Sequence, residues 1–148
     1  MDRRKQRLHT ALAGVHVLLV EDEPDCLEML RAVLEYCGAL VTGALSADDA
    51  MNVLRRVKPD VLVSDVMMPD RDGYWLIRRV RALSPEEGGD IPAIVVTARA
   101  YPADRERVLS EGFQAHLTKP VDPWGLCAAV SALVKRTECA PPPSPPSQ

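Results

Sequence analysis

The sequence predicts an α/β protein with a doubly wound, five-stranded parallel sheet and five helices, a flavodoxin-like fold. Short apolar, β-branched runs of strand length alternate with segments whose apolar residues recur at helical spacing. Alternation of this kind is typical of parallel strands that are covered by helices on both faces. Right-handed crossovers leave few arrangements of such strands, and the doubly wound sheet is favoured among them.

The first half of the chain contains two strand–helix pairs. Residues 15–20 predict the first strand, and Pro24 opens a helix, because proline is tolerated at the first helical position. Apolar residues at helical spacing continue that helix to Gly38, which ends it. Residues 39–44 predict a weaker second strand, and Ser46 is expected to cap the helix that follows.

The middle of the chain predicts a third strand, a third helix and a fourth strand. The strand is the apolar run 61–63, which ends in Asp65 and a loop. Apolar residues between 76 and 83 predict the helix, and residues 86–90 are expected to form a loop. Residues 91–96 predict the fourth strand.

The last part predicts a short polar helix, a fifth strand and a final helix, and it bounds the domain. These elements are expected at residues 102–112, 113–118 and 126–134. The domain organisation is then a basic lead or linker over residues 1–13, one domain over residues 14–136, and a proline- and serine-rich tail over residues 137–148, expected to be disordered or extended.

Composition excludes several classes of protein. The chain has 148 residues, 47% hydrophobic and 26% charged, which suits one globular domain. The net charge of −3 gives no sign of a nucleic-acid-binding surface, and no apolar run approaches the roughly 20 residues of a membrane span. No apolar signal core follows the basic start, and the four cysteines lack CxxC spacing. We therefore expect free thiols and a cytoplasmic protein.

Polar residues follow four of the five strands. Glu21 and Asp22 follow the first strand, Asp65 the third, Thr97 the fourth and Lys119 the fifth. Because parallel strands point the same way, these side chains are expected to meet at one edge of the sheet. Three carboxylates together favour a hard cation such as Mg²⁺. A lysine and a hydroxyl beside them suit a phosphoryl group, with the aspartate as its nucleophile.

Four stretches in this order resemble the receiver domain of two-component response regulators. They are Val-Leu-Leu-Val-Glu-Asp-Glu-Pro-Asp at 17–25, Asp-Val-Met-Met-Pro-Asp-Arg-Asp-Gly at 65–73, Val-Thr-Ala at 96–98 and Leu-Thr-Lys-Pro at 117–120. The resemblance implies strand order 2-1-3-4-5 and phosphorylation of Asp65 by the phosphohistidine of a histidine kinase. It also implies that the chain is not an enzyme beyond catalysing its own phosphorylation, with weak autophosphatase activity at most.

The resemblance assigns a metal site to four residues. It implies Mg²⁺, or alternatively Mn²⁺, bound by Asp22, Asp65 and the carbonyl of Met67, with Glu21 acting through water. Glu21 departs from the aspartate that is commoner at its position. The extra methylene could reach the metal directly or displace a water, so both modes stay open for Glu21.

The resemblance also assigns the phosphoryl-binding and switching residues. Thr97, Ala98 and Lys119 would bind the phosphoryl group, and the bond before Pro120 would be cis. His116 stands where the family usually has Tyr or Phe, so Thr97 and His116 are the candidate switch pair. The alternative for His116 is a half-buried strand histidine with no switching role.

Two residues are expected to set the lifetime of the phosphoryl group. In this family the residues two beyond the phosphoacceptor and two beyond the threonine flank the path of the hydrolytic water; here they are Met67 and Arg99. Met67 can barely orient a water and is expected to shield the phosphorus, and Arg99 cannot act as a base. We therefore expect a long-lived phosphoryl group.

The implied partners are a histidine kinase or a histidine phosphotransfer protein. A homodimer or an output partner would use the face of the fourth helix, fifth strand and fifth helix, and no nucleic acid or membrane is expected to bind. Trp75, Tyr101 and Trp124 are interpreted as packing or surface residues.

Three other functions are weighed against this one. A degenerate receiver that only binds proteins is disfavoured by the intact Asp65, Thr97 and Lys119. A phosphatase or dehalogenase-like hydrolase with an aspartate nucleophile usually needs an acid two residues on, where this chain has Met67. A flavin-binding module would place phosphate beside the acidic stretch 21–23, which would repel it. The absence of a GxxxxGK[ST] motif separately excludes a nucleotide hydrolase.

Overall fold

The computed structural model describes residues 10–98 and 102–139, with the side chains of residues 104–135 in the second range. It contains one five-stranded sheet of order β2-β1-β3-β4-β5, in which every neighbouring pair is parallel, so the predicted fold is confirmed. The strands are β1 (His16–Val20), β2 (Leu40–Ala44), β3 (Val61–Asp65), β4 (Ala93–Thr97) and β5 (Ala115–Thr118).

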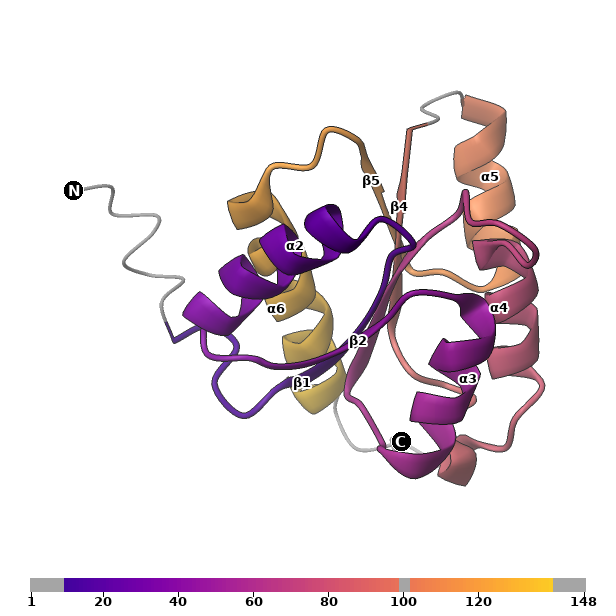
Figure 1. Cartoon of the computed structure of the whole chain (residues 1–148). Coiled ribbons are helices and arrows are strands. Elements are labelled where there is room, and N and C mark those ends of the chain that lie inside the picture. The colour runs from indigo at the N-terminus through magenta and orange to yellow at the C-terminus, as the bar shows by residue number, and fades with distance from the viewer. Residues whose placement is uncertain (1–9, 99–101, 140–148) are drawn as a thin grey trace.

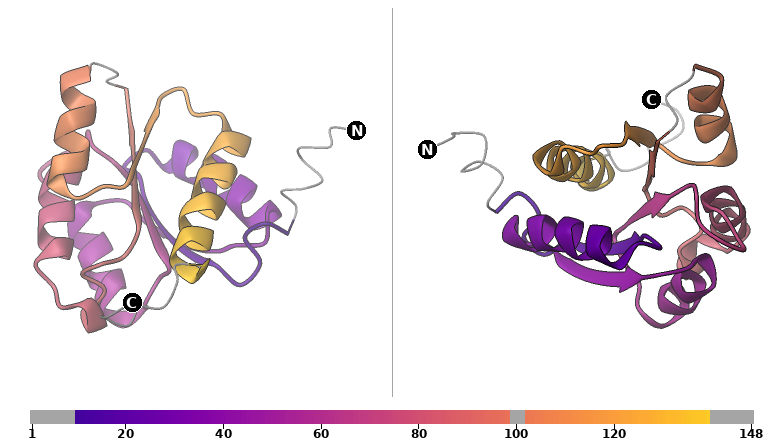
Figure 2. Two further views of the ribbon diagram at one scale, coloured as in Figure 1. Left: turned by 180° about the vertical axis from the view of Figure 1, so that it is seen from behind. Right: turned by 45° about the horizontal axis from the view of Figure 1, so that its top comes forward.

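Helices cover both faces of this sheet. Figures 1 and 2 show α2 and α6 on one face and α3, α4 and α5 on the other. The helices are α2 (Pro24–Tyr36), α3 (Ala47–Arg56), α4 (Gly73–Arg81), α5 (Pro102–Glu111) and α6 (Pro123–Cys139), and a short 3₁₀ helix, η1 (Pro85–Glu87), lies in the segment expected to be a loop. None of the helices in the described part of the chain is long and apolar enough to cross a membrane.

The core is divided in two by the sheet. Alternate residues of each strand face opposite sides, so Leu18 and Leu62 pack with α3, α4 and α5, while Leu19 and Val63 pack with α2 and α6. Leu12, which precedes the expected start of the domain, is fully buried in the second half of the core. Its N–H donates to the carbonyl of Cys37 over 2.9 Å. The packed unit therefore includes Leu12.

Side-chain caps fix where two helices begin. Ser46 accepts a hydrogen bond from the N–H of Asp49 over 3.1 Å, as predicted for the start of α3. Asp72 accepts one from the N–H of Trp75 over 2.9 Å, so α4 begins at Gly73, before its first apolar repeat. Gly73 lies so close to the end of β3 that a Cβ would overlap the carbonyl oxygen of Asp65. This close approach holds the loop after β3, which carries Met67, beside the strand ends.

Candidate functional site

The ends of β1, β3, β4 and β5 bring the sequence-predicted residues to one edge of the sheet, at the top in Figure 1. Glu21 follows β1, Asp65 and Thr97 are the last residues of their strands, and Lys119 follows β5. Glu21 is 3% exposed, Asp65 5% and Thr97 2%, whereas Asp22 is half-buried. Ionisable side chains buried to this degree need partners, because an isolated buried charge is costly.

Lys119 is the partner that two of these carboxylates share. Its Nζ donates to Asp65 Oδ2 over 2.8 Å and to Glu21 Oε1 over 3.0 Å. Burial alone would lower the pKa of the Lys119 ammonium, but the hydrogen bonds to Asp65 and Glu21 outweigh burial, so the pKa is raised. Lys119 therefore stays a cation, with its charge directed at the proposed nucleophile.

Three carboxylates form a cluster that fits a divalent cation. One oxygen each from Glu21, Asp22 and Asp65 lies within 4.8 Å of the others. The second oxygen of Glu21, Oε2, is buried and has no hydrogen-bond partner among the described residues. One ammonium does not balance three carboxylates, and hard oxygen donors are the ligands that Mg²⁺ or Mn²⁺ prefers. The residues present therefore fit the expected metal.

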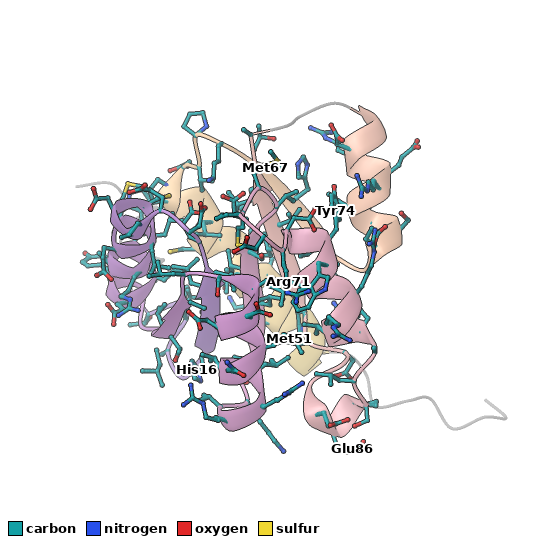
Figure 3. All side chains as sticks on the ribbon, turned by 45° about the vertical axis from the view of Figure 1, so that its right-hand side comes forward. His16, Met51, Met67, Arg71, Tyr74 and Glu86 are labelled. Atoms are coloured by element: carbon teal, nitrogen blue, oxygen red, sulfur yellow. The ribbon has the colours of Figure 1, made fainter. Side chains whose placement is uncertain are left out.

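Met67 lies at the mouth of this cluster. Its N–H donates to Asp65 Oδ1 over 3.1 Å, so both carboxylate oxygens of Asp65 have donors. The Met67 side chain is labelled in Figure 3 and is 59% exposed. Because most of this residue is open to solvent, slow hydrolysis would depend on the lack of an orienting group at this position rather than on shielding by bulk. Arg99, the other residue expected to flank the water path, lies outside the described residues, as does Tyr101.

Cys26 is a neighbour of the site that sequence reasoning placed only on a helix. Burial and the neighbouring Glu21 carboxylate raise the pKa of the Cys26 thiol to about 11. Burial also raises the pKa of the Glu21 carboxyl, as does its neighbour Asp65, while Cys26 and Lys119 act in the opposite direction. The sequence feature that could have revealed this neighbour is the position of Cys26 in the first turn of the helix that follows Asp22. Cys26, Cys37 and Cys127 are free thiols, as expected.

The remaining predicted residues lie on β4 and β5. His116 pairs with Val95 in the sheet, and its neighbours on β5 pack toward α2 and α6, so His116 faces the side of α3, α4 and α5. Thr97, two residues beyond Val95, lies on the same face. The ring nitrogen Nε2 of His116 is buried without a hydrogen-bond partner in the described part of the chain. Ala98 is exposed beside Thr97.

The peptide bond between Lys119 and Pro120 is cis, as the resemblance implied. The Lys119 N–H donates to the carbonyl of Thr97 over 2.7 Å. The backbone of the lysine is therefore held against the end of β4, beside the buried threonine.

Comparison with known proteins decides the family. The sequence profile described as the response regulator receiver domain matches residues 17–131. This chain belongs to the response regulator receiver family. It is a receiver domain of the kind found in two-component response regulators.

This receiver spans most of the length of one relative and about half the length of another. It is 48% identical over 119 residues to an uncharacterized 14.6 kDa protein of Leptolyngbya boryana, covering 80% of this chain and 89% of that one. It is 36% identical over 120 residues to the phosphate regulon transcriptional regulatory protein PhoB of Escherichia coli, covering 81% of this chain and 52% of PhoB. The receiver therefore spans about half the length of such transcriptional regulators.

Solved receiver structures share the fold. The receiver domain of a Francisella response regulator matches with a TM-score of 0.77 and 27% identity, covering 84% of this chain and 99% of that one. The receiver domain of a Pseudomonas aeruginosa sensor histidine kinase matches with a TM-score of 0.74 and 33% identity, covering 82% of this chain and 98% of that one. That structure is described as having a magnesium ion coordinated in its active site cleft.

Proposed function

We propose that this receiver accepts a phosphoryl group on Asp65 from the phosphohistidine of a histidine kinase or a histidine phosphotransfer protein. The observation that carries the proposal is the 2.8 Å hydrogen bond from Lys119 Nζ to Asp65. An oxygen of Asp65 attacks the phosphorus, the phosphorus–nitrogen bond breaks, and its electron pair leaves with the imidazole. Lys119 offsets negative charge on the transferred group, and the buried Thr97 and the neighbouring Ala98 stand beside it.

The same proposal includes a divalent cation, Mg²⁺ or Mn²⁺. Glu21, Asp22 and Asp65 would hold it, and the family resemblance adds the carbonyl of Met67. When bound, the cation supplies neutralisation of phosphoryl charge. The orphaned Oε2 of Glu21 and the magnesium ion in the Pseudomonas aeruginosa receiver support this assignment.

We propose that the signal leaves through Thr97 and His116 to the face formed by α5, β5 and α6. The two residues lie on one face of the sheet, on its last two strands. The buried and unpartnered Nε2 of His116 supports a role beyond filling space, because such an atom is usually hydrogen-bonded. A homodimer or a partner protein would bind this face. Free thiols at Cys26 and Cys127 support the expected cytoplasmic location.

A phosphodonor experiment tests the assignment. The chain is incubated with Mg²⁺ and acetyl phosphate, and intact mass is measured for wild type, Asp65→Asn and the matched control Asp70→Asn. Asp70 is exposed in the same loop, and its positive φ of 68° suits asparagine. We expect wild type and the control to gain one phosphoryl group and Asp65→Asn to gain none. Equal labelling of Asp65→Asn would show that the site is elsewhere, and no labelling of wild type would favour the degenerate, protein-binding receiver.

Calorimetry tests the metal ligands separately. Asp22→Ala is expected to weaken Mg²⁺ binding strongly and Glu21→Ala less, because Glu21 already has Lys119 as a partner. Equal or reversed losses would overturn this ranking of the ligands.

A further inference from the structure

A groove of about 470 Å³ lies between α3 and α4, apart from the residues of the phosphorylation site. Figure 3 shows Arg71 and Met51 where these two helices face each other. Three arginines line the groove: Arg55 from the last turn of α3, Arg71 from the loop before α4, and Arg79 from α4. This surface takes no part in the function proposed above.

The groove is positively charged in a chain that is negative as a whole. Among the described residues that line it, three arginines outnumber the single acidic residue, Asp48, whereas the chain as a whole carries −3. Arg71 is already engaged, because its Nε lies 3.2 Å from a carboxylate oxygen of Asp48. Arg55 and Arg79 form no ion pair with any residue whose side chain the structure describes. Two cations are therefore open to an acidic ligand.

Trp75 holds two of these arginines in place. The guanidinium carbons of Arg71 and Arg79 lie 4.5 and 5.2 Å from the centroid of its half-buried indole ring. Cation–π contacts of this length are attractive and restrict the arginine side chains. A ligand that pairs with Arg79 then orders fewer rotamers on binding, which favours affinity.

Two apolar side chains also line the groove, together with the polar Asn52. Met51 of α3 is buried and Leu83, after α4, is half-buried, and both line the groove. The surface therefore combines two open guanidiniums with the partly exposed apolar side chain of Leu83, which lies in the same groove as the buried Met51. Such a combination matches a ligand that carries carboxylates together with an aliphatic side chain.

We propose that this groove docks an acidic segment of a partner protein. Carboxylates of the segment would pair with Arg55 and Arg79, and an aliphatic side chain would lie on Met51 and Leu83. A nucleotide fits less well, because guanidiniums already cover the Trp75 ring on which a base would stack. Duplex DNA fits less well too, because its phosphates would extend past the groove over a chain of net charge −3.

Fluorescence of Trp75 offers a direct probe. The full chain carries Trp124→Phe, so that Trp75 is its only tryptophan. The probe peptide is acetyl-Asp-Glu-Leu-Asp-Glu-Leu-Asp-amide, and its control has Asn and Gln in place of Asp and Glu. Titrations are made at about 0.05 M salt, where screening of exposed charges is limited. We expect the acidic peptide to change the fluorescence with saturation and the amide peptide to leave it unchanged.

Two double variants separate the groove from overall charge. Arg55→Gln with Arg79→Gln removes the open groove cations, whereas Arg56→Gln with Lys135→Gln removes the same charge from exposed positions elsewhere. Two exposed ion pairs together change affinity by about tenfold. We expect that loss in the groove variant and a change of less than about twofold in the control.

Four results would overturn the proposal. They are absence of saturable binding of the acidic peptide, an unchanged affinity in the groove variant, an equal loss in the control variant, and tighter groove-dependent binding of GTP or a DNA duplex than of the peptide.

Discussion

Replacing Glu21 by glutamine is expected to stabilise the metal-free receiver while weakening its metal binding. Glu21 is buried next to the carboxylates of Asp22 and Asp65, and the ammonium of Lys119 donates to Glu21 and Asp65. Glutamine keeps the shape of the side chain and removes its charge. The substitution therefore tests whether the charge of Glu21 stabilises the fold or serves only metal binding.

The contacts at the strand ends give the size of the effect. The ligand oxygens of the three carboxylates lie at most 4.8 Å apart. At an effective dielectric constant of about 20, like charges at that separation repel by about 3.5 kcal/mol, so Asp22 and Asp65 together cost Glu21 at least about 7 kcal/mol. The attraction between Glu21 and the ammonium of Lys119, 3.0 Å away, offsets about 5.5 kcal/mol of this repulsion on the same scale. The balance is about 1.5 kcal/mol against the charged glutamate. The raised pKa of Glu21 has the same sign.

Urea unfolding in the presence of EDTA measures this difference. We expect Glu21→Gln to gain about 1–2 kcal/mol, or about 3–6 °C in melting temperature for a domain of this size. With saturating Mg²⁺ the gain should vanish or reverse, because the cation binds the wild-type carboxylates more tightly. Glu35→Gln on the exposed side of α2 is the matched charge control and should change little in either condition.

A clear loss of stability in metal-free Glu21→Gln would refute the reasoning. It would mean that the attraction of Lys119 outweighs the repulsion among the carboxylates. An equal gain in Glu35→Gln would instead assign the effect to the net charge of the chain.

Three further predictions concern the loop after Asp65 and the helices beside it. Gly73→Ala would press a methyl group against the end of β3, so we expect a loss of more than about 1 kcal/mol in urea unfolding; an unchanged midpoint would contradict this close approach. The double variant Met67→Asn with Arg99→Glu should shorten the lifetime of the phosphorylated chain with Mg²⁺ by about tenfold, because each new side chain can orient water. If the double variant decays no faster than wild type, these two side chains do not set the lifetime. The pKa of Glu111 is lowered by its hydrogen bonds from Arg78, so the stability that this pair adds is present above the unfolded pKa of about 4.3 and is lost as pH falls through the lower folded value. Arg78→Gln should therefore make acid unfolding less steep below pH of about 4.3, and an unchanged acid transition would show that the pair adds nothing.

The sheet and the meeting of its strand ends were predictable because they follow from pattern and topology. Apolar runs fix which segments become strands, and parallel strands must place Asp65 and Lys119 at the same edge. The local chemistry of Ser46 likewise predicted the start of α3. These features depend on neighbouring residues or on the direction of strands, both of which can be inferred without distances.

The features that escaped sequence analysis depend on how separate elements pack. The burial of Leu12 requires the segment before β1 to lie against the end of α2. The contact between Cys26 and Glu21 depends on how α2 is rotated over the sheet. Trp75 was interpreted as a packing or surface residue, whereas its contacts with Arg71 and Arg79 arise from the loop and helix on either side of it.

The two hydrogen bonds of Lys119 also bear on the speed of signalling. The ammonium lies beside Asp65 before any phosphodonor arrives, so β5 need not move to deliver it. A charge that is already in position costs little reorganisation during the reaction. Its bond to Glu21 is a resting contact that the lysine can exchange for a phosphoryl oxygen. If Asp65 is phosphorylated as proposed, Lys119 changes partners without a movement of β5, and we expect the slow steps to be the docking of the donor and the response of the helices.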